Sequence, residues 1–258
     1  SSEGRLKITL YWGNIKPVKE NYRFYLTLIN GLYQVWGKED NYPLRGMYPT
    51  TEWSEKRVVR DEHIIPILPG TPPGFYQVVV DVYAEGRGEW VKPEGVERVV
   101  LGPVELPGWE VTENELDVEH WVRQELGGKV MLLGYNVLPP LDEPLKPGQT
   151  IHLTLFWKAL ADMDEDYTVF THLVGPDGEI WGQKDNPPVG GFYPTSWWKQ
   201  GQIIRDQYDI VISPDALPGR YQLEVGMYLA ETGERLPVLS EERQLIGDKI
   251  LLGNVFVQ

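Results

Sequence analysis

Apolar and polar residues alternate with a period of two along most of this chain. The clearest runs place apolar side chains at every second position over residues 6–12, 76–82, 151–157 and 221–227. Successive side chains of a strand point to opposite faces, so this alternation predicts half-buried β-strands. Turn signals such as GPDG, SPDALPG and ETGE separate the runs. The pattern predicts an all-β fold of immunoglobulin- or fibronectin-III-like antiparallel β-sandwiches.

The sequence also contains an internal repeat. A shift of 145 residues aligns residues 9–89 with 154–234 without a gap. The densest match sets WGKEDNYPLRGMYPTTEW, from Trp36, against WGQKDNPPVGGFYPTSWW, from Trp181. We therefore expect two tandem sandwiches with the same strand order, over residues 1–106 and 126–258, joined by an acidic linker over 107–125.

Two details of the repeat give further expectations. Tyr76 and Tyr221 each follow a Pro-Gly turn, where immunoglobulin-like domains bond a tyrosine back to the chain. The strand expected over 129–137 has no counterpart ahead of Leu6, so we expect the first domain to be truncated at its N-terminus. Its sandwich should then expose the edge where that strand would pair, unless residues 99–106 or 111–118 fill the place.

Composition narrows the class of protein. The chain is 41% hydrophobic, with ten Trp and no Cys, which excludes a disordered chain, a disulfide framework and a thiolate metal site. The net charge of −14 repels phosphate backbones, so we expect no nucleic-acid partner. No apolar run approaches the roughly 18–20 residues of a membrane span, so none is expected in this sequence. The oligomeric state is left open.

The second copy resembles a module of bacterial surface proteins, especially of the Chloroflexi. The matching stretches are LLGYNV from Leu132, LKPGQTIHLTLFWKAL from Leu145, DYTVFTHLVGPDG from Asp166, GGFYPTSWW from Gly190 and LPGRYQLEVGMYLAETGERLPV from Leu217. Such modules often follow the membrane-spanning part of family 39-type glycosyltransferases. The resemblance covers nearly all of residues 126–258 and the first copy more loosely. It implies an extracytoplasmic β-sandwich appendage at the cell surface, and it brings no catalytic residue to transfer.

Enzyme signatures are missing from the sequence. It has no G-x-S-x-G, no H-E-x-x-H, no glycine-rich phosphate loop and no cysteine nucleophile. We therefore expect a non-catalytic extracytoplasmic binding or spacer module, part of a larger membrane-associated protein, and no enzyme. An accessory carbohydrate-binding module is one alternative, and a β-sandwich glycosidase or lyase is the other. The partner would be a glycan or a cell-surface protein.

Positions at which the copies differ are where a binding function could have been added. Trp197 stands opposite Glu52 of the first copy and beside the shared Trp198. Adjacent strand residues point opposite ways, so Trp197 should be exposed if Trp198 is buried. An exposed aromatic side chain can stack on a sugar or pack against a protein. Trp197, Tyr193 and Phe192 form the candidate binding platform.

The shared loop D-N-x-P-x-x-G-x-Y-P-T-x-x-W offers oxygen ligands for calcium. In the second copy these are Asp185 and Asn186, with Asp206 following on the next strand. Calcium loops place carboxylates at alternate positions, whereas these are scattered. Asp and Asn before Pro more often begin a turn by bonding their own backbone. We therefore favour a turn over a calcium site for this loop, and we expect no cofactor.

Overall fold

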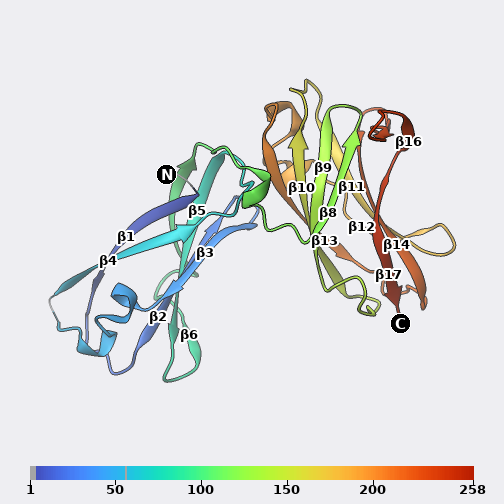
Figure 1. Cartoon of the computed structure of the whole chain (residues 1–258). Coiled ribbons are helices and arrows are strands. Elements are labelled where there is room, and N and C mark those ends of the chain that lie inside the picture. Colours follow the sequence, from blue (N-terminus) through green and yellow to red (C-terminus); the bar gives the residue numbers. More distant parts are fainter. Residues whose placement is uncertain (1–3, 56) are drawn as a thin grey trace. The chain divides into compact units, whose positions relative to one another are not determined.

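The fold was analysed on a computed structural model that describes residues 4–55 and 57–258. Within these residues the regular elements are β-strands and short 3-10 turns, and the strand pairs are antiparallel, which confirms the predicted all-β fold (Figure 1). The chain divides into two compact units, Ser1–Trp109 and Glu110–Gln258. No helix in the described part is long and apolar enough to cross a membrane.

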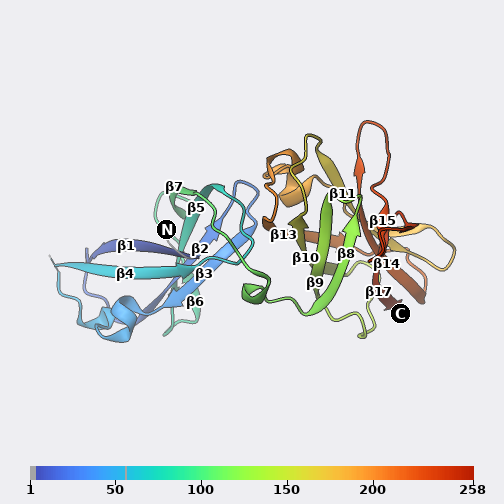
Figure 2. The same cartoon turned by 45° about the horizontal axis from the view of Figure 1, so that its top comes forward.

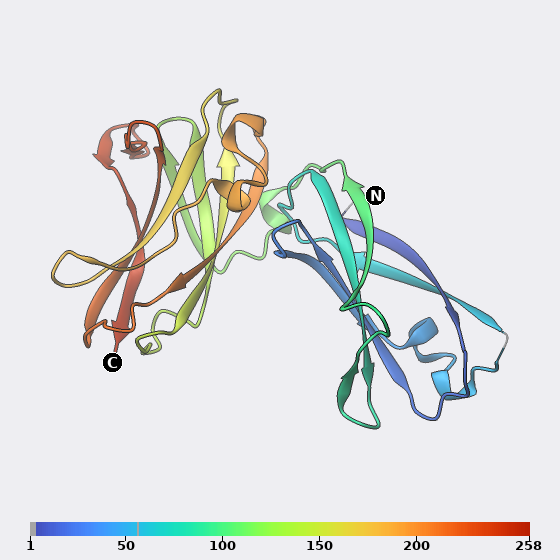
Figure 3. The ribbon, with the colours of Figure 1, turned by 180° about the vertical axis from the view of Figure 1, so that it is seen from behind.

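The first unit contains a two-stranded and a five-stranded sheet (Figure 1). The smaller sheet pairs β1 (Arg5–Gly13) with β4 (Val58–Pro66). The larger one has the order β3 (Val35–Asn41), β2 (Tyr22–Ile29), β5 (Gly74–Ala84), and β5 then pairs with both β6 (Glu89–Val91) and β7 (Val99–Leu106). The β5–β6 hairpin is teal in Figure 3.

The second unit contains a six-stranded and a four-stranded sheet. The six-stranded sheet has the order β13 (Ile203–Val211), β10 (Thr150–Ala159), β9 (Val130–Leu138), β8 (His120–Leu126), β15 (Val238–Leu239), β16 (Leu245–Gly247). The four-stranded sheet has the order β12 (Ile180–Gln183), β11 (Tyr167–Val174), β14 (Gly219–Leu229), β17 (Ile250–Val257).

The corresponding strands of the two units pair in the same order. β4–β1 in the first unit matches β13–β10 in the second, and β3–β2–β5–β7 matches β12–β11–β14–β17. The second unit adds β8, β9, β15 and β16, and the first adds β6. The 145-residue offset therefore reflects a shared strand order as well as a shared sequence.

The alternating apolar residues form the cores, as predicted from the period of two. Leu26, Leu28 and Val78 are buried in the first unit, and Ile151, Leu153 and their neighbours in the second. Four of the six paired tryptophans are buried, and Trp12 and Trp181 are half-buried. Both tyrosine corners form as expected, because the hydroxyl groups of Tyr76 and Tyr221 donate to the carbonyls of Pro72 and Leu217, each at 2.7 Å.

The segment expected to be an acidic linker, 107–125, includes part of a strand. From Glu110 onward it belongs to the second unit, where β8 begins at His120. Leu116 and Val118 pack against the buried cluster of Leu133, Phe156 and Ile203. Partial burial of these two apolar side chains stabilises the packing of the segment against β9, β10 and β13 of the second unit.

The repeated loop lies between β3 and β4 and again between β12 and β13. Its 3-10 turns are η1 (Pro43–Gly46) and η2 (Thr50–Glu52) in the first unit, and η4 (Pro188–Gly191) and η5 (Thr195–Trp197) in the second. A further turn, η3 (Glu113–Glu115), carries a capping box from Thr112 and Glu115. The repeated loop contains most of the candidate residues singled out in the sequence.

Candidate functional site

The proposed platform of Trp197, Tyr193 and Phe192 is only partly presented to solvent. Trp197 is 60% exposed and Trp198 is buried, as expected. The reason differs from the predicted strand alternation, because Trp197 ends the 3-10 turn η5 and Trp198 follows it. Tyr193 is buried, and its hydroxyl bonds the Trp197 carbonyl and the Gln202 side chain, each at 3.1 Å. Phe192 is half-buried. Tyr193 therefore supports Trp197 edge-on, with ring centroids 6.1 Å apart, and the exposed aromatic surface is a single indole.

The residues considered for calcium are used by the protein itself. Asp206 is fully buried, and its carboxylate accepts the Val189 N–H at 2.7 Å and the Tyr208 hydroxyl at 2.6 Å. Asp185 pairs with His172 at 3.2 Å, and Asn186 pairs through its backbone with Val169. Among residues 4–55 and 57–258, no group of three or more His, Cys, Asp or Glu side chains could hold a metal ion. Asp185 and Asn186 thus contact β11, and the turn in which they bond their own backbone stays a prediction.

Three contacts hold the repeated loop in both units. Asp61 and Asp206 accept the N–H groups of Leu44 and Val189, whose φ angles of 49° and 57° lie in the left-handed region. The hydroxyls of Thr50 and Thr195 donate to the carbonyls of Glu20 and Glu165. The indole N–H groups of Trp53 and Trp198 donate to the carbonyls of Tyr48 and Tyr193. These six residues, shared by both copies, are structural.

The two anchoring acids differ in their environment. Beside Asp61 stands His63, which contacts Asp61 at 2.9 Å and Glu39 at 2.7 Å. Burial alone would raise the pKa of Asp61, but the hydrogen bonds from His63 and the Leu44 N–H outweigh it and lower that pKa. In the second unit the residue two along is Tyr208. Burial of Asp206 outweighs its hydrogen bonds and raises its pKa to about 7.

A groove of about 420 Å³ lies on the open face of the larger sheet of the first unit. Its lining includes Tyr25 and Thr27 from β2, Asp40 from β3, Asp81 from β5 and Trp90 from β6. Strand register places these residues on one face, since Tyr25 pairs with both Asp40 and Asp81. This volume falls in the usual range for a small-molecule site.

Trp90 is held in position by aromatic neighbours. Its ring meets Tyr25 at a centroid distance of 4.8 Å and Tyr83 at 5.2 Å, both edge-on. Tyr83 is its cross-strand partner in the β5–β6 hairpin. The Trp90 side chain is nevertheless 55% exposed. The groove thus combines an oriented, accessible indole with polar side chains.

The carboxylates of the groove are paired with arginines but remain accessible. Arg23 lies 2.5 Å from Asp40, and Arg98 lies 3.6 Å from Asp81. Arg23 also covers the ring of Tyr25 at 5.6 Å. Because both carboxylate side chains are partly exposed, their remaining oxygen lone pairs can accept hydrogen bonds from a ligand.

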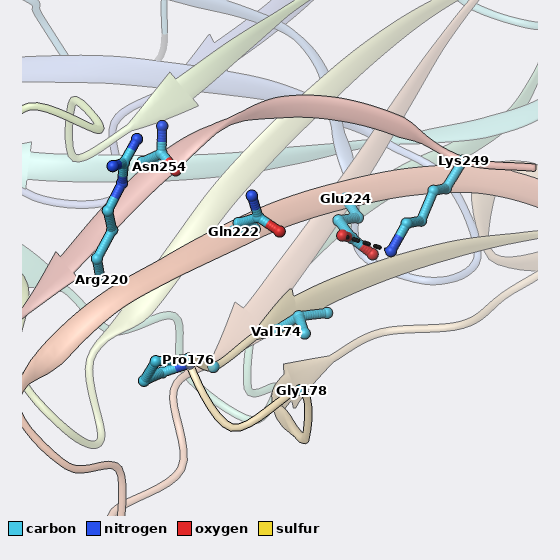
Figure 4. A pocket seen from close by; sticks show the side chains of 9 residues that line it. Val174, Pro176, Gly178, Arg220, Gln222, Glu224, Lys249 and Asn254 are labelled. Carbon is cyan, nitrogen blue, oxygen red and sulfur yellow. Dashed lines mark ion pairs between the residues drawn. The ribbon is translucent and has the colours of Figure 1, made fainter. Parts of the chain in front are cut away.

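The corresponding sheet of the second unit carries a groove of different chemistry, about 570 Å³ in volume. Figure 4 shows Arg220, Gln222 and Glu224 in a row along β14, with Asn254 beside them on β17. Lys249 reaches Glu224 at 2.7 Å. The lining of this groove contains no aromatic residue.

The groove at Trp90 was not predicted from the sequence. The aligned repeat ends at residue 89, so Trp90 was never compared with its counterpart, Arg235. The same rule that singled out Trp197 would have found it, because Trp90 differs between the copies. Its closeness to Tyr25 depends on the pairing of β2, β5 and β6, which the sequence does not display.

Comparisons with known proteins give no family. No family model matches the chain. Curated proteins named Ribosomal RNA small subunit methyltransferase G are similar over 150 residues, at 28% identity in Burkholderia thailandensis and 29% in Burkholderia mallei and Burkholderia pseudomallei. The matched region covers 55% of this chain and 61% of each relative, so the similarity spans less than two thirds of those proteins.

These relatives correct one expectation. The lack of catalytic motifs predicted that the chain is not an enzyme, whereas the curated proteins it matches bear the name of an enzyme. The prediction is therefore wrong as stated, since it considered only known short motifs. Among solved structures, a protein of Corynebacterium diphtheriae described as membrane anchored is similar at 12% identity, covering 98% of this chain and 59% of that one. Its TM-score of 0.23 carries no argument.

Proposed function

We propose that the first unit binds a carbohydrate in the groove beside Trp90. One observation carries the proposal: Trp90, which is 55% exposed and packs against two tyrosines, lines the same groove as two partly exposed carboxylates. The C–H face of a sugar ring packs on an aromatic ring, and its hydroxyl groups hydrogen-bond to carboxylates. Binding sites commonly combine aromatic walls with a few placed polar groups.

The charge of the groove favours a neutral sugar. The charged residues that line the groove are Lys38, Glu39, Asp40 and Asp81. Glu39 is paired with His63, and Asp40 and Asp81 are each paired with one arginine. The chain as a whole carries a net charge of −14, which opposes the approach of acidic polysaccharides. The ligand class is therefore a neutral oligosaccharide of a size that a groove of about 420 Å³ accepts.

This binding suits the location that the sequence resemblance implies. We propose an extracytoplasmic module at the cell surface, attached to a larger membrane-associated protein, with a surface glycan as its partner. The resemblance of residues 126–258 to bacterial surface modules supports this location. Protease accessibility of the protein on intact source cells tests it, and protection until the cells are lysed would contradict it.

Glycan-array screening of the whole chain, followed by calorimetry with the best neutral oligosaccharide, tests the binding. Trp90→Ala should weaken binding by about 30-fold, the effect of a residue that contributes about 2 kcal/mol. Trp197→Ala is the matched control, because Trp197 is equally exposed but lies in the other unit. Thermal unfolding of each variant confirms that the hairpin remains folded.

The two substitutions separate the candidate platforms. Loss of binding in Trp197→Ala with full binding in Trp90→Ala would move the site to the second unit. If no neutral glycan binds the wild-type chain, the aromatic cluster serves only to brace the β5–β6 hairpin, and the proposal is wrong.

A further inference from the structure

The groove on the second unit brings three polar side chains to one face of a sheet. It follows β14 and β17, which pair with each other (Figure 2). Arg220 and Gln222 lie two positions apart on β14, and Asn254 stands opposite Gln222 on β17 (Figure 4). Alternate residues of a strand and directly opposed residues of a strand pair share a face, so these three side chains line the same side of the sheet.

These three side chains are not used by the protein itself. Within residues 4–55 and 57–258, Arg220 forms no ion pair, and the side-chain amides of Gln222 and Asn254 form no hydrogen bond. Arg220 carries five N–H donors in one plane, and each amide offers both donors and an acceptor. Arg220 and Gln222 are exposed, so a ligand can reach them. The groove therefore presents one free positive charge beside two free amide groups.

The other charges of the lining cancel each other. The charged residues that line the groove are Arg220, Glu224 and Lys249, and Lys249 lies 2.7 Å from Glu224. Asp177, in the turn beside the groove, accepts the Trp181 indole N–H at 3.1 Å and is not part of the lining. Exposed charges farther away than about 8 Å are screened at physiological ionic strength. Arg220 is therefore the main charge that a small anion meets in the groove.

The first unit shows that the fold does not require these charges. The 145-residue offset places Phe75 at the position of Arg220 and Val79 at the position of Glu224. Val79 is 3% exposed, and Glu224 is nearly as buried, at 5%. Removing an ion pair from water costs free energy that the attraction between the ions often does not offset, so valine serves stability at least as well. The pair of Glu224 and Lys249 therefore needs an explanation other than folding.

We propose that this groove binds a small sugar acid, a ligand with one carboxylate and several hydroxyl groups. The Arg220 guanidinium pairs with the carboxylate through two parallel N–H···O bonds. The amides of Gln222 and Asn254 bond hydroxyl groups as donors and acceptors. Glu224 holds the Lys249 ammonium in the same row, where its remaining N–H groups donate to a further ligand oxygen (Figure 4).

The lining also distinguishes a sugar acid from other carboxylates. It contains no aromatic residue, and its polar side chains form a row along β14. A ligand with hydrogen-bonding groups on every side fits such a lining better than an apolar peptide side chain, whose burial would leave these polar groups without partners. The site lies in the second unit, so it does not depend on sugar binding at Trp90.

Glucuronate is the probe, titrated into the whole chain and followed by calorimetry and by NMR. We expect one glucuronate bound per chain, with NMR signals shifted at Arg220, Gln222 and Asn254. Glucose lacks the carboxylate, and propionate lacks the hydroxyl groups. Each should bind at least about tenfold more weakly, because each loses hydrogen bonds to the groove. Equal binding of glucuronate and glucose, or no binding of glucuronate, overturns the proposal.

Substitutions of the arginine test the carboxylate contact. Arg220→Gln should weaken glucuronate binding at least about tenfold. Arg220→Lys, which keeps the charge without the planar donors, should weaken binding less than Arg220→Gln does. Arg243→Gln is the matched control, because it removes an equal charge from the same unit outside the lining, and it should leave binding unchanged. Binding that survives Arg220→Gln overturns the proposal.

The double substitution Glu224→Val with Lys249→Met tests the buried pair. It keeps the net charge and introduces the valine that the first unit carries at this position. Thermal unfolding should be unchanged or shifted to higher temperature, whereas glucuronate binding should weaken about tenfold. Loss of thermal stability with full binding of glucuronate would show that the pair is structural and would overturn the role given to Lys249.

Discussion

The two units place the same acid at the same position and give it opposite properties. Asp61 and Asp206 both accept the N–H of a residue in the left-handed region. Next to Asp61 stands His63, which also contacts Glu39, and next to Asp206 stands Tyr208. A neighbour that can carry a positive charge lowers the pKa of Asp61, whereas a neutral neighbour leaves burial to raise the pKa of Asp206 to about 7.

A contact that both units share therefore does not fix the protonation state of the acid. The geometry needs only a carboxyl oxygen that accepts one N–H group, and both charge states supply it. The residue two positions after the acid, His63 or Tyr208, determines whether the charged or the neutral form of the acid is stable. The stabilities of the two units should consequently respond differently to pH.

The largest effect is expected from removing the acid. Asp206→Ala leaves the Val189 N–H, the Tyr208 hydroxyl and the Trp157 indole N–H without their buried acceptor. The free energy of unfolding of the second unit should fall by about 3–5 kcal/mol. Urea unfolding followed by hydrogen exchange, which distinguishes the units, measures it. An effect below about 1 kcal/mol would mean that the loop does not depend on this anchor.

A change of pH should separate the units next. Burial raises the pKa of Asp206 to about 7 in the folded state, whereas the ordinary pKa of 3.8 applies in the unfolded chain. The folded state then binds more protons between these values, so the second unit should lose about 2–4 kcal/mol of stability as pH rises from 4 to 7. Asp206→Asn should remove most of this loss.

The first unit should respond in other pH ranges. Burial lowers the pKa of His63, but contacts with Asp61 and Glu39 outweigh it and raise that pKa above 6.5. The stabilisation of the first unit by His63 is complete below pH 6.5 and is lost as pH rises through the pKa of His63 in the folded state. The stabilisation of the first unit by Asp61 is present above pH 3.8 and is lost as pH falls through the lowered pKa of Asp61. His63→Tyr should give the first unit the pH response of the second; an unchanged profile would contradict the comparison.

The smallest effect should be the same in both units. Tyr76→Phe and Tyr221→Phe each remove one hydroxyl that donates to a carbonyl four residues earlier. Each unit should lose about 1 kcal/mol of stability, the net value of one hydrogen bond. Thermal unfolding of the two single variants compares them. A clear inequality would show that the corner contributes differently in the two sandwiches.

Much of the fold could be predicted because its determinants are local. The period of two identified the strands, the Pro-Gly turn before Tyr76 identified the corner, and the repeat identified the shared strand order. Successive strand residues point to opposite faces, so Arg205 covers the Phe156 ring on the outer face while Asp206 contacts Trp157 in the core. Residues that are close in the sequence determine these features.

The candidate groove could not be predicted because it depends on distant residues. Tyr25 and Trp90 meet only because β5 pairs with β2 along one edge and with β6 along the other. Asp206 could not be recognised as a buried acid, since its sequence neighbours do not show that Val189 and Trp157 enclose it. Strand register and burial determine both the groove at Trp90 and the state of Asp206. The tertiary fold sets both of these quantities.

The three contacts that hold the repeated loop make it suitable as a display scaffold. Between the anchors, Arg45 and Met47 are exposed, and Met47 makes none of the three contacts. A short recognition peptide grafted at this point would keep the loop's fixed ends, because the anchoring side chains lie outside the graft. The same graft at residues 190–192 would present the peptide a second time on one polypeptide, giving a bivalent reagent from a single gene.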